Sequence, residues 1–140
     1  MKTLKRSLFV LIITSIFFSC NFEKIKVNQT YTNLDNLSNV TDSINRNQFI
    51  FFFNGGFNNE RVKVFSNGKK IYDKIITHRI VVDDEIHFEK SEKNTIQFEI
   101  NGKKSNVFNL DSRYHYAIIE YFDYKSEIEC NYWNSSPGFD

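Results

Sequence analysis

Five side chains near the end of the chain have the types and spacing of a binding surface. They lie in two apolar-rich stretches, 114–123 and 126–134, which turn at 124–125. In an antiparallel hairpin with a loop of two or of four residues the facing pairs are the same. These pairs are Tyr116 with Trp133, Ile118 with Asn131, and Glu120 with Glu129, all on one face.

This face predicts a site for a ligand or partner. Aromatic rings stack against the C–H faces of sugars, while carboxylates and the Asn131 amide can exchange hydrogen bonds with hydroxyls. We therefore expect a glycan or an envelope protein to bind here, at Tyr116, Trp133, Glu120, Glu129 and Asn131, rather than at the Gly55-Gly56 loop. The alternative is a solvated outer face whose aromatic pair supports the strands. Like charges directly opposite cost a sheet about 0.2 to 1 kcal/mol, so the glutamates need a cation, a proton or water.

Catalysis by the two glutamates is a further hypothesis. Retaining glycosidases hold two carboxyl groups about 5 to 5.5 Å apart, close to the spacing across neighbouring strands. A flat outer face, however, has no cleft that excludes water or distorts a substrate. The pattern thus favours a non-catalytic binding module, with a purely structural protein as the other alternative.

The remaining reactive residue types do not form a recognised motif. The three histidines, His78, His87 and His115, lie in separate segments, and 83–85 lacks the alternation and glycine of a calcium loop. No nucleotide-binding or nucleophile-elbow motif occurs. Cys130 falls opposite Ile119 on the apolar face of the last hairpin, where a cysteine packs as a small hydrophobe. We predict no metal and no cofactor.

The amino terminus carries an export signal. Lys2, Lys5 and Arg6 precede an apolar run at 8–18, which is too short to span a bilayer. The segment "FFSC" that ends at Cys20 resembles a bacterial lipobox, with Phe17 where Leu is usual. The resemblance implies a signal peptide at 1–19, a lipid on Cys20 and attachment to the outer membrane, facing the periplasm or the cell surface. An ordinary secretion signal or an uncleaved apolar anchor is the alternative.

Length and charge limit the function classes. The chain has 140 residues, enough for one domain, and a formal net charge of +1. Removing 1–19 leaves 15 basic residues against 17 acidic ones, and no run of five like charges occurs. This balance argues against a nucleic-acid partner, and it leaves membrane attachment to the lipid.

The chain after Cys20 divides into a tether and a domain. Residues 20–47 are rich in Asn, Thr, Ser and Asp without sustained periodicity, which predicts a polar tether with one short ordered segment at 34–40. From residue 48 short apolar or alternating runs follow one another to the end. They are 48–54, 61–66, 69–77, 79–90, 95–100, 103–110, 114–123 and 126–134, with 79–90 bent or broken at 83–84.

These runs predict an all-β domain at 48–140: a single antiparallel β-sandwich of about eight or nine short strands, preceded by a signal helix and the tether. Asn67-Gly68 and Asn101-Gly102 are hairpin turns, because both residue types accept the positive φ of a type I′ turn. The expected facing pairs are Val64–Ile71, Lys63–Tyr72, Ile96–Val107 and Glu99–Lys104. The stretch "FFFNGGFNNERVKVFSNGKKIY" resembles small immunoglobulin-like domains of secreted bacterial lipoproteins, a likeness that implies the sandwich and no particular function.

Overall fold

The alternation of apolar and polar residues produces strands in the computed structural model, which describes residues 24–32, 47–77 and 85–134. Cys20, the signal region, the segment at 34–40, His78 and residues 83–84 lie outside the described residues. The described part contains ten strands and one short 3-10 helix. They are β1 (Lys26–Tyr31), β2 (Gln48–Phe53), β3 (Glu60–Ser66), β4 (Lys69–Ile76), β5 (Glu85–Glu89), β6 (Thr95–Ile100), β7 (Lys103–Lys104), β8 (Phe108–Asn109), β9 (Tyr116–Phe122), η2 (Asp123–Lys125) and β10 (Glu127–Trp133).

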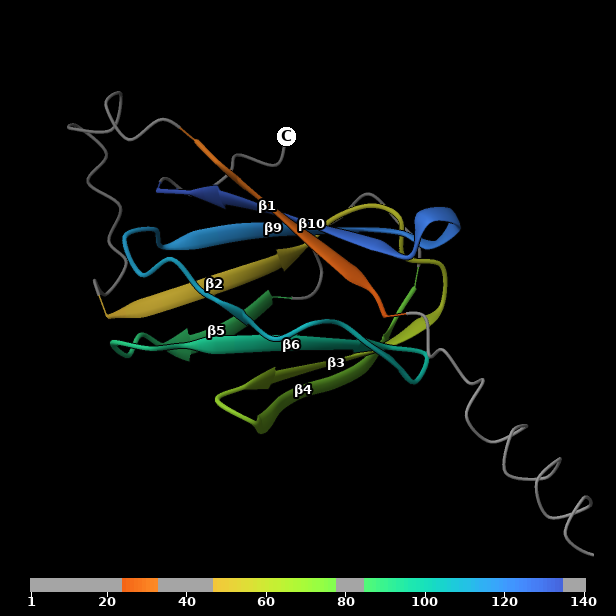
Figure 1. The fold of residues 1–140 in the computed structure, drawn as a ribbon, viewed down its shortest axis with the longest axis horizontal. Coiled ribbons are helices and arrows are strands. Elements are labelled where there is room, and N and C mark those ends of the chain that lie inside the picture. Colours follow the sequence, from red (N-terminus) through yellow and green to blue (C-terminus); the bar gives the residue numbers. More distant parts are fainter. Residues whose placement is uncertain (1–23, 33–46, 78–84, 135–140) are drawn as a thin grey trace, which may run out of the picture.

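The strands form two five-stranded sheets that pack as a β-sandwich (Figure 1), which confirms the predicted fold class. One sheet has the order β1-β10-β9-β2-β5. The other has the order β4-β3-β6-β7, with β8 also paired to β6. Most pairs are antiparallel, but β1 runs parallel to β10 and β2 runs parallel to β9. Two parallel contacts within the first sheet therefore join distant parts of the chain.

Aromatic rings fill the space between the sheets. The ring of Phe51 in β2 lies 5.8 Å from that of Phe98 in β6, and Phe53 lies 5.2 Å from Tyr72 in β4. Phe49, Phe51, Phe98 and Tyr132 are all fully buried. Large rings at these positions remove much apolar surface from water, which is the main stabilising term in a domain of this size.

The first strand corrects the predicted tether. Residues 20–47 were expected to be a tether, yet Lys26–Tyr31 pair with residues 127–132 of β10, and Ile25 is fully buried. Gln29 lies on the inward face, where its side-chain oxygen accepts a 2.7 Å hydrogen bond from the Tyr132 hydroxyl. A polar residue at an inward position interrupts the apolar alternation, and so hides the strand from a pattern search. The sandwich begins before residue 48.

The two Asn-Gly turns form as predicted. Asn67 and Gly68 have φ values of 50° and 77°, and Asn101 and Gly102 have 49° and 84°. The pair Glu99–Lys104 is confirmed. The other three predicted pairs are wrong by one residue. A β-bulge between Val64 and Phe65 shifts β4, so that Val64 faces Tyr72 and Lys63 faces Asp73, while Ile96 faces Phe108. Bulges insert one extra residue without a sequence signal of their own.

Candidate ligand-binding site

The last hairpin has the predicted register. Tyr116 faces Trp133, Ile118 faces Asn131, and Glu120 faces Glu129. The loop spans 123–126, with Ser126 at a φ of 50°, so the four-residue alternative applies. Because side chains alternate along a strand, these six residues share the face of the sheet turned away from the core.

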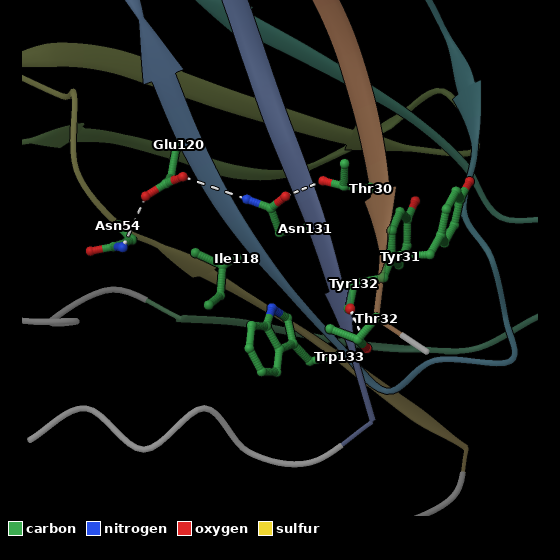
Figure 2. Close-up of a pocket in the computed structure, with 9 residues that line it drawn as sticks. All are labelled: Thr30, Tyr31, Thr32, Asn54, Ile118, Glu120, Asn131, Tyr132 and Trp133. Carbon is green, nitrogen blue, oxygen red and sulfur yellow. Dashed lines mark hydrogen bonds between the residues drawn. The ribbon is translucent and has the colours of Figure 1, made fainter. Parts of the chain in front are cut away.

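Part of this face is hollowed into a pocket of about 320 Å³ (Figure 2). Three elements far apart in the sequence supply its walls: β1, the β9–β10 hairpin and the residue that follows β2. The lining residues are Thr30, Tyr31, Thr32, Asn54, Ile118, Glu120, Asn131, Tyr132 and Trp133. Three of the five predicted residues, Glu120, Asn131 and Trp133, thus lie together in it.

A row of hydrogen bonds crosses the pocket floor (Figure 2). The Asn54 amide donates to Glu120 Oε1 at 3.1 Å, and the Asn131 amide donates to Glu120 Oε2 at 3.5 Å. The Thr30 hydroxyl in turn donates to Asn131 Oδ1. The nitrogen of the Asn54 amide is therefore engaged, as are both the nitrogen and the oxygen of the Asn131 amide. These bonds fix the orientation of the amides and hold Glu120 as an acceptor. The carboxylate keeps unused lone pairs that can accept hydrogen bonds from a ligand.

The two amides also explain how facing glutamates are tolerated. Each oxygen of Glu120 accepts one amide hydrogen, which offsets the repulsion expected between Glu120 and Glu129. Among the described residues Glu129 does not line the pocket; its neighbour on β1 is Asn28. Only one carboxylate of the pair is therefore positioned to meet a ligand there.

The prediction that Tyr116 offers an open ring is wrong. Its side chain is buried, in a second cluster with Ile50 and Phe52, and its ring stacks on that of Phe52 with centroids 5.9 Å apart. Trp133, by contrast, is 37% exposed. The parallel β2–β9 contact places two large apolar residues beside Tyr116, a neighbourhood that sequence periodicity does not reveal. Of the two predicted rings, Trp133 is the one that lines the pocket.

Sequence reasoning missed the contributions of Thr30, Thr32 and Asn54. The two threonines belong to β1, which was assigned to the tether. Asn54 precedes the Gly55-Gly56 pair, where no ligand was expected to bind. The Asn54 N–H donates to the Ile119 carbonyl at 2.9 Å, extending the parallel pairing by one residue and bringing its side chain to Glu120. The alternation of Ile25 and Val27 with polar residues was the available signal for β1.

The other reactive residues stand apart from the pocket. Cys130 is fully buried opposite Ile119, as predicted, and burial raises the pKa of its thiol to about 12. His87 contacts Glu85 at 2.8 Å, and His115 Nδ1 lies 3.1 Å from Lys90 Nζ. Within the described residues, no group of three or more His, Cys, Asp or Glu side chains could hold a metal ion. No helix in residues 24–32, 47–77 and 85–134 has the length and hydropathy to cross a bilayer.

The pocket combines one half-exposed indole, two oriented amides, one carboxylate and two hydroxyl groups, on three adjoining strands and the loop after β2. Such a set can stack against an apolar ring face and exchange several hydrogen bonds with its polar rim. A scan against protein-family models and searches of curated proteins and of solved structures find no match to this chain.

Proposed function

We propose that the protein is an outer-membrane lipoprotein that binds a saccharide without transforming it. The observation that carries this proposal is the juxtaposition of the Trp133 ring with the hydrogen-bonded row of Asn54, Glu120, Asn131 and Thr30. Sugars present a C–H face that packs on indole and a rim of hydroxyls that both donate and accept. Glu120 accepts only, and Thr30 accepts because its hydrogen is donated to Asn131, whereas the Asn131 amide keeps a second N–H to donate.

The separation of the two glutamates supports binding over hydrolysis. A retaining glycosidase needs both carboxyl groups at the scissile bond, one as acid and one as nucleophile. Here Glu120 lines the pocket while Glu129 lies beside it, next to Asn28.

Trp133→Ala is expected to weaken saccharide binding by about 1 to 2 kcal/mol, or roughly 5- to 30-fold, because aromatic anchors dominate many binding sites. The domain should keep its stability, since the side chain is 37% exposed. The measurement is titration calorimetry with the saccharide selected on a glycan array. Trp133 is the only tryptophan, so its fluorescence should also change on binding.

Glu129→Ala is the matched control, since it lies on the same face of the same strand as Trp133 and outside the pocket. It should leave the affinity unchanged. Equal losses in both variants would place the binding site elsewhere on the face. A loss of about 3 to 5 kcal/mol of stability in Trp133→Ala would instead identify a core residue. If no saccharide binds, and an envelope protein binds in a way that requires Trp133, the ligand is a protein and the proposal of a saccharide is wrong.

The lipid on Cys20 predicts how the protein is retained. Cys20→Ala should move it to the soluble fraction or leave an unprocessed precursor, because acyl chains bury many methylene groups in the bilayer. Intact mass spectrometry of the membrane-bound protein checks this. A mature protein with an unmodified Cys20 would contradict the anchor while leaving the pocket untouched.

A further inference from the structure

The first residues of β1 lie between two turns at one end of the sandwich (Figure 1). The Ile25 N–H donates to the Lys104 carbonyl at 3.2 Å, beside the turn that joins β6 to β7. The Lys26 N–H donates to the Ser126 carbonyl at 2.9 Å, beside η2. Two backbone hydrogen bonds therefore bring three chain segments together around the start of β1.

This end is rich in lysine. Its exposed cations come from all three segments and surround the point where the chain enters β1; they are Lys24, Lys26, Lys103 and Lys125, the β1-start surface. Carboxylates also lie at this end, including Glu60, whose charge acts on the Tyr121 hydroxyl. Glu127 is 3.4 Å from Lys26, and Asp123 accepts a hydrogen bond from the Tyr121 hydroxyl. The nearby Glu99 is bound by Lys63 at 2.5 Å, so the surface carries a local excess of positive charge.

An exposed aromatic residue accompanies the lysines. Tyr124 is 78% exposed at the tip of the η2 turn, and the Lys125 ammonium lies 5.2 Å from its ring centroid. Phe122 lies beside it, with ring centroids 6.2 Å apart. Tyrosine with flanking lysine is typical of the headgroup region of membranes, where the ring enters the interface and the cation meets phosphate.

We propose that the β1-start surface rests on a bilayer and binds its anionic phospholipid headgroups. Each lysine near an anionic membrane increases partitioning about fivefold, so these cations would add to the attachment that the lipid supplies. Cys20 lies five residues before Ile25, so a lipid there is within about 18 Å of this surface. The charge itself belongs to the described residues and does not depend on the lipid.

This arrangement changes the expectation drawn from net charge. A mature chain with more acidic than basic residues would be repelled weakly by an anionic leaflet, but the cations gather at the attached end. The pocket residues Thr30 and Thr32 lie at the other end of β1, away from that surface. Binding at the membrane would thus leave the pocket open to the periplasm or to the medium.

The test measures partitioning of the full chain carrying Cys20→Ala, so that no acyl chain contributes. Vesicles contain either phosphatidylcholine alone or phosphatidylcholine with one third phosphatidylglycerol. The triple variant Lys24→Gln/Lys103→Gln/Lys125→Gln should lose at least tenfold in partitioning to the anionic vesicles and show no change with the neutral ones. Raising the salt to about 1 M should remove the difference, because the Debye length falls to about 3 Å.

A control triple removes equal charge from the opposite end. Lys69, Lys70 and Lys93 lie at the β3–β4 and β5–β6 turns, which are joined there by a 2.8 Å hydrogen bond from the Asn67 N–H to the Thr95 carbonyl. Their replacement by Gln should change partitioning by less than twofold. Equal losses in the two triples would show a net-charge effect and overturn the proposal, as would no loss in either. Neither result would bear on the saccharide pocket.

Discussion

Gly56→Ala should destabilise the domain by about 3 to 5 kcal/mol, a large part of the stability of a domain this size. A Cβ at this position would lie 1.7 Å from the Tyr121 carbonyl oxygen and 2.8 Å from its carbon. Both atoms belong to the backbone of a central strand, so they cannot move aside without breaking the sheet. The loop after β2 would have to lift away from β9, and Asn54 would lose its place beside Glu120.

Gly68→Ala is the matched control for this prediction. Its φ of 77° is close to the 79° of Gly56, but a Cβ there would meet nothing within 4 Å. It should cost only the backbone strain of a positive φ, about 1 to 2 kcal/mol. Chemical denaturation gives the free energy of unfolding of both variants, and the difference between them separates the cost of the Cβ contact from the cost of backbone strain. Equal losses would mean that the close approach of Gly56 to Tyr121 contributes nothing.

Ile25→Ala should cost about 2 to 5 kcal/mol, because the side chain is fully buried and its removal leaves a cavity. Ile25 precedes β1 and forms an isolated bridge with Ser105, so it joins the first strand to the second sheet. The loss should appear as a lower denaturant midpoint with an unchanged slope.

The same substitution at Ile75 is the control, since that side chain is 61% exposed on the edge strand β4. It should cost about 1 kcal/mol or less. A stability unchanged in Ile25→Ala would mean that residues 24–32 are dispensable, and that the domain begins at residue 48 after all. A loss confined to Ile25 would establish β1 as part of the folding unit.

Local signals predicted the turns well, although three of the four facing pairs at the Asn-Gly hairpins were wrong by one residue. The Asn-Gly pairs require a positive φ at two successive residues, a requirement that few other residue pairs meet at low cost. The last hairpin was predicted in full register, because the facing pairs were independent of the loop type and Cys130 had to share the apolar face with Ile119. Those two facts were enough to place Glu120, Asn131 and Trp133 on one face.

Contacts between distant segments were beyond the reach of sequence patterns. The parallel pairing of β1 with β10 includes a polar inward residue, Gln29, which accepts a hydrogen bond from the Tyr132 hydroxyl. The burial of Tyr116 depends on the parallel neighbour β2. Parallel partners are joined by long connections without a turn motif, so nothing local marks them. For this reason the sequence did not reveal that β1 and the residue after β2 line the pocket.

The parallel alignment of the first and last strands also determines how the domain would bear force. A protein held through the residues before β1 and pulled by a ligand at the end of β10 has its two loaded strands drawn past each other lengthwise. All six residue pairs between them then carry the load at once. An antiparallel first strand would be pulled from a single end, and its hydrogen bonds would open one after another. Resistance to pulling is set by the unfolding rate, and this shear geometry should lower that rate under force. The domain would then stay folded for longer on a ligand that is itself under tension.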